Sequence, residues 1–463
     1  MVGMCTRPSE PPPPPTTIWY MGVKTRLLEP LEAAIAPLLA ARSSRTHPPR
    51  LLDLLCGTGV VGARLAPRAS VWATDAQAYA CVLARARLQP AAGLESALER
   101  CLQRAERARE ALFERYGAVL EAERRWFERA EEPGSIDAYC RWAEQEASGH
   151  DPARACAGCR PDTFPPRLVT AYYRNVYFGV RQAIELDALR WAIEAESEPA
   201  ARNALLAALL FAASRATSAT AHFAQPRALS RRSERERLVQ RRQIDVRARF
   251  VERLQQLERE QAAQRARGGF RHPHRVERRE VVSWTRTAVR EPVDVVYADP
   301  PYTADNYSRF YHVLETLVHY DYPPLATRAG RLTRGRYPAL ERRLRSPFSS
   351  PATVEAAFAA VCGFAARLGA ALVWSYARPN GLLIRRVYDG QLAPFERLLG
   401  RFYREVEITE IPLAHSGAGS RALRTHELIA VCREPRSRPL PVSRKTSEPR
   451  ARTQPAATEI ANS

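Results

Sequence analysis

Asp299, Pro300, Pro301 and Tyr302 stand together directly after a short apolar segment, and their groups suit the binding of a nitrogen base. The Asp299 carboxylate and the Pro300 carbonyl can accept the two hydrogens of an exocyclic amino group, while the Tyr302 ring can stack on the base. Two successive prolines withhold backbone N–H donors, so nearby carbonyls stay free to face a ligand. An amino nitrogen held in this way keeps its lone pair localised, which suits methylation of that nitrogen. A plain Pro-Pro turn capped by Asp299 is the alternative, so the sequence context must decide.

The segment before these residues predicts the element that positions them. Residues 293–298 are apolar and rich in β-branched side chains, which is typical of a buried parallel strand. Ligands of open α/β sheets bind beyond the carboxyl ends of such strands. Residues 299–302 are therefore expected to line a crevice.

A second pattern covers residues 51–75. An apolar strand runs into a turn that contains Gly57, Gly59 and Gly62, where backbone amides and a helix N-terminus can approach a ligand closely. The next strand ends in Asp75, at the position where such folds bind ribose hydroxyls. The pattern predicts a nucleoside-binding half, although dinucleotide-binding oxidoreductases and simple β-α-β turns share it.

Further elements of the same sheet follow from apolar periodicity. Additional strands are expected within residues 276–284, 371–376 and 427–432. In the first of these segments, Glu280 either faces a cofactor or is a solvated charge. Residues 306–317 predict a helix on which Tyr307, Tyr311 and Glu315 share one face. His312 on that helix is expected to be a packed histidine without a catalytic role.

The middle of the chain has a different character. Between residues 91 and 270 the composition is rich in Ala, Arg, Glu and Leu with helical spacing. Two long helices, one from Leu94 to Leu120 and one from Leu238 to Leu257, are expected to pair as an antiparallel arm. The aromatic residues of 172–178 either stack on nucleic acid or belong to the core, and aromatic residues at this spacing are more often core.

The charge balance indicates a polyanionic partner. Lysine and arginine number 70 against 50 acidic residues, a formal charge of +20, and nucleic acid fits this balance better than a membrane surface. The segment 328–345 looks like a mobile basic loop whose arginines contact phosphates, or else a solvated charge run. Its arginines include Arg331, Arg334, Arg336, Arg342 and Arg343.

Cysteine usage and hydropathy favour a reducing compartment. The nine cysteines form no secreted framework, no apolar stretch approaches the roughly 20 residues of a spanning helix, and prolines occupy the place of a signal peptide. A cytoplasmic protein without a membrane partner is expected. Unpaired cysteines are the expected state, although a structural zinc site is conceivable at Cys140, His150, Cys156 and Cys159.

These patterns divide the chain into five parts. Residues 1–17 form a proline-rich tail that is expected to be disordered, and residues 18–90 the first half of an α/β domain. Residues 91–270 form a helical insertion and possible DNA-recognition region. Residues 271–432 form the second half of the α/β domain, and residues 433–463 a basic tail that is also expected to be disordered.

The motifs resemble those of the Dam-like family of adenine-specific DNA methyltransferases. The family's Tyr-x-Gly-x-Lys corresponds to residues 20–24, its Asp-x-Phe-x-Gly-x-Gly to residues 53–59, and its Asp-Pro-Pro-Tyr to residues 299–302. Segments at residues 175–191, 308–316 and 374–376 also look similar to a bacterial branch of the family. The sequence departs from the family pattern at Leu55, which replaces an aromatic residue, and at Val23, which replaces a small polar one.

The resemblance implies a Rossmann-like α/β methyltransferase fold with a long helical insertion, and S-adenosylmethionine as the methyl donor. Carried over by position, it implies that Asp299, Pro300, Pro301 and Tyr302 are catalytic, with no metal. The implied cofactor-binding residues are Tyr20, Gly22, Lys24, Asp53, Cys56, Gly57, Gly59, Asp75 and Glu280.

The implied activity is transfer of a methyl group to N6 of an adenine flipped out of double-stranded DNA. A separate restriction endonuclease is a possible partner. Three alternatives remain: methylation of cytosine N4 in DNA, methylation of adenine N6 in RNA, and a catalytically silent nucleic-acid-binding protein.

Overall fold

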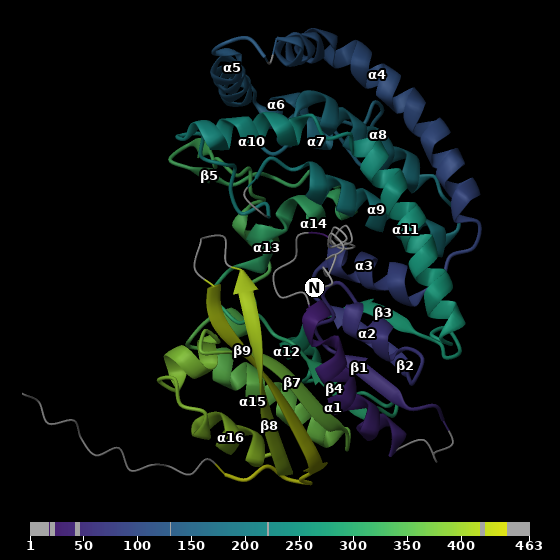
Figure 1. Ribbon diagram of the computed structural model, residues 1–463, viewed down its shortest axis with the longest axis vertical. Coiled ribbons are helices and arrows are strands. Elements are labelled where there is room, and N and C mark those ends of the chain that lie inside the picture. The colour runs from purple at the N-terminus through teal and green to yellow at the C-terminus, as the bar shows by residue number, and fades with distance from the viewer. Residues whose placement is uncertain are drawn as a thin grey trace, which may run out of the picture.

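The computed structural model describes residues 18, 24–41, 47–129, 131–219, 222–416 and 422–441, without the side chains of residues 413–416 and 422–425. The chain forms a mixed α/β structure around a mostly parallel sheet, with a region of helices above the sheet (Figure 1). This confirms the predicted α/β class and is compatible with a Rossmann-like fold. The predicted N-terminal tail, Tyr20, Gly22 and residues 442–463 lie outside the described residues.

The central sheet has seven strands in the order β3-β2-β1-β4-β7-β9-β8. Their bounds are β1 Arg50–Asp53, β2 Ser70–Asp75, β3 Arg275–Arg278, β4 Val295–Ala298, β7 Ala371–Arg378, β8 Tyr403–Ser416 and β9 Ala422–Pro435. The first five strands in the sheet order are parallel, whereas β9 runs antiparallel to both of its neighbours. A separate two-stranded hairpin consists of β5 (Thr327–Arg328) and β6 (Arg331–Leu332).

The chain reverses its direction of travel across the sheet between β1 and β4. From β1 it proceeds to β2 and β3 on one side, and from β4 to β7 on the other, while β1 and β4 are parallel neighbours. Asp53, the last residue of β1, is paired with Tyr297, two residues before Asp299. Ligand crevices of open α/β sheets lie at such a switch point, beyond the carboxyl ends of the strands.

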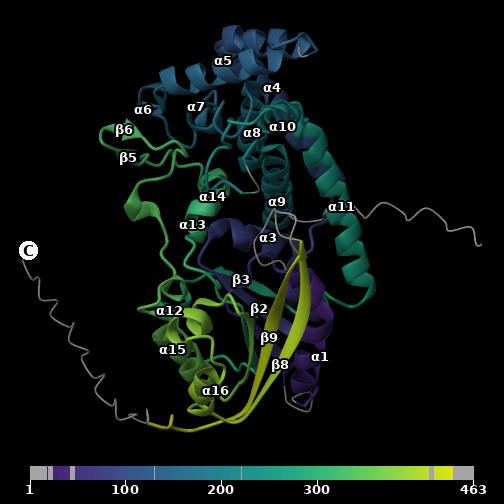
Figure 2. The same cartoon turned by 60° about the vertical axis from the view of Figure 1, so that its left-hand side comes forward.

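Helices cover both faces of the sheet because its buried residues alternate in direction. Leu52, Val296 and Trp374 belong to one apolar cluster, and their chain neighbours Leu51 and Val295 to the other. One face is covered by α12 (Val281–Trp284), α15 (Val354–Arg367) and α16 (Ala393–Gly400), and the other by α1 (Leu28–Ala40), α2 (Val60–Leu65) and α3 (Ala78–Leu88). Figure 2 shows α1 on one side of the strands and α15 and α16 on the other.

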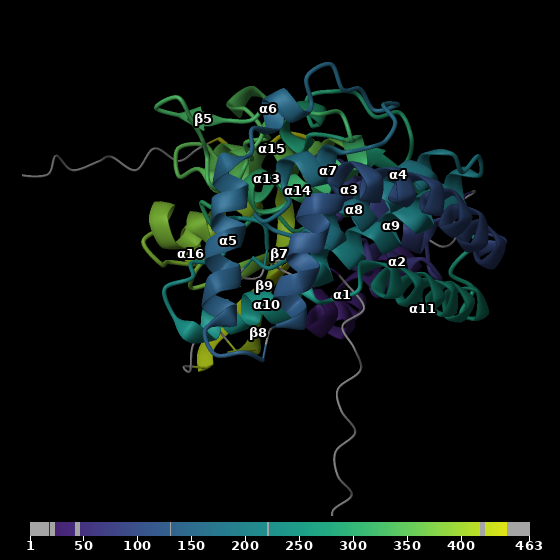
Figure 3. The same cartoon turned by 90° about the horizontal axis from the view of Figure 1, so that it is seen from above.

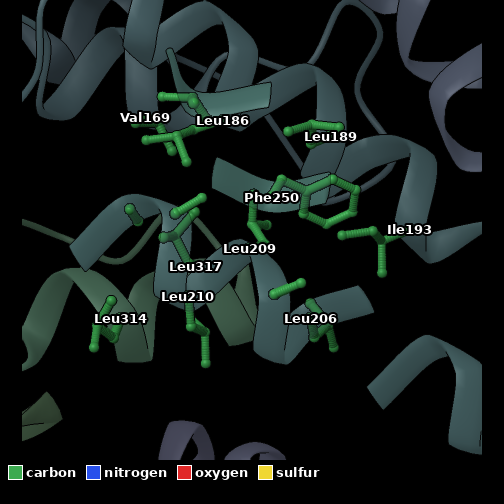
Figure 4. Close-up of a cluster of buried hydrophobic side chains, with 14 of the residues drawn as sticks. Val169, Leu186, Leu189, Ile193, Leu206, Leu209, Leu210, Phe250, Leu314 and Leu317 are labelled. Carbon is green, nitrogen blue, oxygen red and sulfur yellow. The ribbon is translucent and has the colours of Figure 1, made fainter. Parts of the chain in front are cut away.

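The helical region above the sheet contains most of the insertion together with two helices that follow β4. Its elements are α4 Leu94–Glu128, α5 Ser135–Gly149, α6 Pro152–Ala155, α7 Leu168–Tyr172, α8 Val180–Glu194, α9 Pro199–Ala216, α10 Arg232–Arg242, α11 Val246–Ala266, α13 Tyr307–Phe310 and α14 His312–His319. Figure 4 shows Leu186 and Leu189 of α8, Leu209 of α9 and Phe250 of α11 in one apolar cluster with Leu314 of α14. The helix that follows the Asp-Pro-Pro-Tyr motif is therefore part of the core of the insertion.

The predicted antiparallel arm is wrong. Helix α4 packs mainly along α8, and α11 mainly along α9 (Figure 3). The apolar residues expected to join the two arms instead pack against α8 and α9, which are buried on nearly every side. The second arm is also broken, since α10 ends at Arg242 and the Asp245 carboxylate caps α11 by accepting the Ala248 N–H at 2.9 Å.

The predicted bounds of several other elements differ from the structure, whereas one predicted part of the core is confirmed. The expected helix over residues 306–317 is interrupted at Tyr311, which separates α13 from α14. The expected start of the C-terminal tail at residue 433 is too early in the chain. Strand β9 continues to Pro435, and the Leu440 N–H donates to the Arg401 carbonyl at 2.8 Å. Strand β8 was not predicted. The core interpretation of residues 172–178 is confirmed, since Tyr173, Tyr177 and Phe178 are fully buried.

Four short helical turns complete the elements of the described residues. They are η1 Lys24–Leu27, η2 Leu340–Arg342, η3 Pro347–Ser349 and η4 Leu383–Val387. In the described ranges no group of three or more His, Cys, Asp or Glu side chains is placed to hold a metal ion, and this includes the four residues considered for zinc. None of the helices in the described part of the chain is long and apolar enough to span a membrane.

Glu123 joins α4 to the start of α8. Its buried carboxylate accepts the backbone N–H groups of Val180 at 2.8 Å and Arg181 at 3.0 Å, and the Tyr139 hydroxyl at 3.2 Å. The two backbone N–H groups belong to the N-terminus of α8 and have no partner within that helix. The carboxylate therefore caps a helix that is distant in sequence.

We expect Glu123→Ala to lower the free energy of unfolding by about 1–3 kcal/mol, because it leaves buried N–H groups without an acceptor. Urea unfolding followed by circular dichroism measures the change. Glu121→Ala is the matched control, since Glu121 lies on the same helix and makes only exposed pairs with Arg124 and Arg125. Equal losses in the two variants would contradict the capping role.

Candidate active site

A cavity of about 430 Å³ opens at the carboxyl ends of β1, β2 and β4, at the switch point of the sheet. This volume lies within the range of small-molecule sites in proteins. Asp53, Asp75 and Asp299, which end or follow these three strands, all line it. The far wall is formed by residues 304–308 and by the segment 344–350.

The glycine turn after β1 brings the backbone close to this cavity. Gly57 has φ 51° and donates its N–H to Asp75 Oδ2 at 3.1 Å. Gly59 has φ 74°, and a Cβ atom there would lie 2.7 Å from the Cα of Ala84 on α3. A side chain at Gly59 would therefore push α3 away from the turn. Both glycines are needed for the backbone conformation that shapes the cavity wall.

Two carboxylates at the wall retain unused acceptor capacity. Asp53 is fully buried, and within the described chain its oxygens make no hydrogen bond of normal geometry, although the backbone N–H groups of Leu55 and Gly62 lie near enough to lower its pKa. Burial raises the pKa of Asp53 well above its usual value, and the charges of Asp299 and Asp75 raise it further. Burial raises the pKa of Asp75 to about 6, opposed by N–H groups of Gln77 and Gly57. A ligand with hydroxyl groups or a positive charge fits these two acids.

A buried ion pair fixes Asp299. Lys24 Nζ lies 2.9 Å from Asp299 Oδ2 and 3.3 Å from Glu427 Oε1, and its side chain is only 5% exposed. Burial lowers the pKa of Lys24, but the charges of Asp299 and Glu427 outweigh it and leave the pKa above its usual value. For Asp299, burial raises the pKa to about 6, against the opposing effect of Lys24. A single cation thus serves two carboxylates.

Tyr302 is held from several directions. Its hydroxyl donates to Asp299 Oδ1 at 2.8 Å and to the Glu427 carboxylate, which also accepts from Ser375 Oγ at 2.6 Å. Lys24 Nζ lies 4.7 Å from the centre of the Tyr302 ring. The ring also meets Tyr376 edge to face at 5.3 Å. The side chain is thereby fixed beside Asp299 at the cavity wall.

The structure brings most of the predicted site residues together. The residues that line the cavity are Lys24, Asp53, Cys56, Gly57, Asp75, Glu280, Asp299, Pro300, Pro301 and Tyr302. Gly59 does not line the cavity but lets the turn pack closely against Ala84 of α3. Tyr20 and Gly22 lie outside the described residues. Glu280 has a structural role as well, because its carboxylate caps α12 through the N–H groups of Val282 and Ser283.

Sequence reasoning missed Glu427 and Ser375. Both are buried in strands that were predicted from their apolar residues, β9 and β7. A charged residue at the start of the apolar segment 427–432 was a signal, because a buried acid needs a partner. The sequence did not indicate that this partner is Lys24, about 400 residues earlier.

The basic segment 328–345 is not uniformly a solvated loop. Arg345 lines the cavity at its mouth, and Arg331 and Arg334 are exposed. Arg336 is instead 7% exposed and donates from Nη2 to the Ala147 carbonyl of α5 at 2.7 Å. Part of this segment is thus anchored to the helical region.

One segment of the chain is similar to known proteins. Residues 282–335, which include the Asp-Pro-Pro-Tyr motif, match the family model of D12 class N6 adenine-specific DNA methyltransferases. A stretch of 54 residues, 11% of this chain, is 44% identical to modification methylase LlaI of Lactococcus lactis subsp. lactis. The match covers 9% of that relative. No solved structure matches the chain. The resemblance to adenine-specific DNA methyltransferases is confirmed for this segment.

The ion pair of Lys24 generates a prediction about stability. In Lys24→Met, the buried Asp299 carboxylate faces Glu427 without a cation, so the pKa of Asp299 rises further above that of the unfolded chain. Protons then bind the folded state more strongly, and stability relative to wild type falls as pH increases from about 5 to about 8. Melting temperatures measured by circular dichroism across this range test the effect.

The double variant Lys24→Met/Asp299→Asn is the control. With one of the two carboxylates removed, the pH dependence should return toward that of the wild type. Parallel pH profiles of wild type and Lys24→Met would show that the ion pair does not set the protonation of the site.

Proposed function

We propose that the chain transfers a methyl group from S-adenosylmethionine to N6 of adenine in double-stranded DNA. The observation that carries this proposal is the position of the Asp-Pro-Pro-Tyr motif. It lies in the segment that matches the D12 family and forms one wall of the cavity that Asp53, the glycine turn and Asp75 also line. The motif and the nucleoside-binding pattern, separated by more than 200 residues, share one cavity.

The cofactor half of the cavity fits S-adenosylmethionine. When bound, this cofactor supplies a methyl group carried on a positively charged sulfur. The oxygens of Asp53 can accept from its amino group or hydroxyls, and Asp75 stands where ribose hydroxyls bind in such folds. The amide-rich turn at Gly57 admits the nucleoside without a clash from a side chain.

The other half of the cavity supplies acceptors for an amino group. Asp299 and the Pro300 carbonyl would hold the two hydrogens of adenine N6, which keeps the lone pair on nitrogen. As the nitrogen–carbon bond forms and the carbon–sulfur bond breaks, the nitrogen must lose one proton, and the Asp299 carboxylate is placed to accept it. Lys24 keeps that carboxylate ionised and oriented. Tyr302 and Tyr307 provide aromatic walls.

Adenine inside a duplex cannot reach this cavity, so the base must be flipped out at a cost of a few kcal/mol. The net charge of +20 supports binding of the phosphate backbone, which can offset that cost. The matched relative is named a modification methylase. The proposal extends to the corresponding role, protection of DNA sites from a separate restriction endonuclease.

The first test is transfer of labelled methyl from S-adenosylmethionine to duplex DNA, with an RNA arm and separation of the hydrolysed products. We expect N6-methyladenine in DNA, with the rate reduced about 100-fold or more in Asp299→Asn because an acceptor at the reacting nitrogen is lost. Asp162→Asn, an exposed acid of the helical region, is the matched control and should transfer at the wild-type rate.

If the label is found in cytosine or in RNA, the proposed methyl transfer stands but the proposed substrate is wrong. No transfer by a folded protein that binds DNA would overturn the proposal in favour of a silent binding protein.

The pH dependence of transfer follows from Asp299. Its carboxylate must be ionised to accept hydrogen bonds, and its pKa is raised to about 6 by burial. We expect the single-turnover rate to be constant above about pH 7 and to fall as the pH decreases through about 6. Saturating cofactor keeps the titration of Asp75 from contributing through binding. A rate that stays level down to about pH 5 would contradict this role.

A further inference from the structure

A second cavity, of about 990 Å³, lies between α5 and the hairpin β5–β6. It is also lined by residues of α6 and α10, by residues 333, 334 and 336 after the hairpin, and by the loop residues Asn175, Val176, Pro226, Arg227 and Leu229. It shares no lining residue with the first cavity. Figure 1 places β5 between α10 above it and α13 below it, and Figure 2 shows β5 and β6 together near α6. The proposed methyl transfer uses none of its residues.

Buried hydrogen-bond donors without partners gather at this cavity. Three of these donors are Arg242 Nε, Asn175 Nδ2 and Arg336 Nη1, which have no acceptor among the described residues. The three residues are only 3%, 6% and 7% exposed, so water has little access to them. All three residues line the cavity, as does His150, whose Nε2 atom is also unpartnered. A buried donor without an acceptor costs about 1–3 kcal/mol. Several of them in one wall indicate a missing acceptor.

The same side chains are held rigidly by their other atoms. Arg242 donates from Nη1 to Asn175 Oδ1 and from Nη2 to the Asn175 carbonyl, both at 2.9 Å. Arg336 Nη2 donates to the Ala147 carbonyl at 2.7 Å. The donors that remain are therefore fixed in place before any ligand arrives, which lowers the entropy cost of binding.

The backbone at two of these residues adopts the left-handed conformation, which asparagine tolerates and arginine rarely adopts. Arg336 has φ 51° and Asn175 has φ 57°. The left-handed region is uncommon for a residue with a Cβ, and for arginine it costs free energy. Such conformations persist where the position of a side chain matters, and here both side chains line the same cavity.

The charges around the cavity are not balanced. The lining contains five arginines, Arg227, Arg242, Arg331, Arg334 and Arg336, but only two acids, Glu144 and Asp151. Arg227 is paired with Glu234. Arg242 and Arg336 make no ion pair within the described chain. Burial lowers the pKa of Arg336, although the nearby charge of Asp151 opposes this effect.

We propose that this cavity is a phosphate-binding site. Phosphate oxygens are acceptors only, and the planar guanidinium group matches their geometry and charge. A phosphate in the cavity could approach the Arg242, Asn175 and Arg336 side chains that line it and neutralise charges that the protein leaves unpaired. Two sources share this chemistry: the backbone of DNA, which rests on the proposed function, and free inorganic phosphate, which does not. Exposed Arg331 and Arg334 at the open side extend the positive surface for a nucleic-acid strand.

The test compares full-length wild type with Arg336→Gly, since glycine adopts the φ of this position without strain. Against chloride of equal ionic strength, inorganic phosphate at about 10 mM should raise the melting temperature of wild type by about 2 °C and leave the variant unchanged. Binding of a duplex oligonucleotide at several salt concentrations is the second readout. The variant should bind about three- to ten-fold more weakly, with a log–log salt slope smaller by about one.

Arg259→Ala, an exposed arginine of α11 outside the cavity, is the matched control for loss of one charge. If Arg336→Gly does not fold, Arg331→Ala replaces it with the same two readouts, because that side chain is exposed and lines the cavity. A phosphate response alone assigns free phosphate, and a change in duplex binding alone assigns the DNA backbone. The proposal is overturned if the cavity variant matches Arg259→Ala in both readouts. Neither readout requires methyl transfer, so failure of the proposed enzyme activity is observed separately.

Discussion

The buried contact of Lys24 with Asp299 and Glu427 is the constraint on which the site depends. It joins the turn before α1, the end of β4 and the antiparallel strand β9, which are far apart in sequence. Removing charges from water is costly, and the cost is recovered only when geometry and hydrogen bonds are good. Ser375 and Tyr302 provide the additional hydrogen bonds to Glu427. The position of Asp299 therefore depends on contacts between strands and turns that are distant in sequence. The local motif determines only which reactive groups are present.

A second link fixes the helical region relative to the sheet. Glu315 on α14 accepts the backbone N–H groups of Ala78 and Tyr79 at the start of α3, at 3.0 and 3.1 Å. From the same helix, Leu314 and Leu317 enter the core of the insertion. One short helix that follows the Asp-Pro-Pro-Tyr motif thus contacts both α3 beside the sheet and the inserted helices. The insertion is thereby fixed against the sheet, because α9 and α14 both pack on α3.

The elements that could be predicted are those whose signal is local. Buried parallel strands such as β4 are continuous apolar segments, and the turn at Gly57 and Gly59 is visible because its left-handed backbone favours glycine. Strand β8, at the edge of the sheet, alternates charged with apolar residues, which is itself a local strand pattern that the sequence-based prediction overlooked. The pairing of α4 with α8, and of Lys24 with Glu427, depends on long-range packing that one sequence does not encode locally.

The distribution of charge resolves two opposed requirements of the proposed reaction. The donor carries a positive charge on sulfur, whereas DNA is a polyanion. The cavity is acidic, with Asp53, Asp75 and Asp299 at its wall, although the chain has a charge of +20. Arginines are placed away from the cofactor half, at the mouth and around the second cavity. Methyl transfer removes the charge on sulfur, so the acidic wall would hold the product less strongly than the donor, and charge alone favours product release.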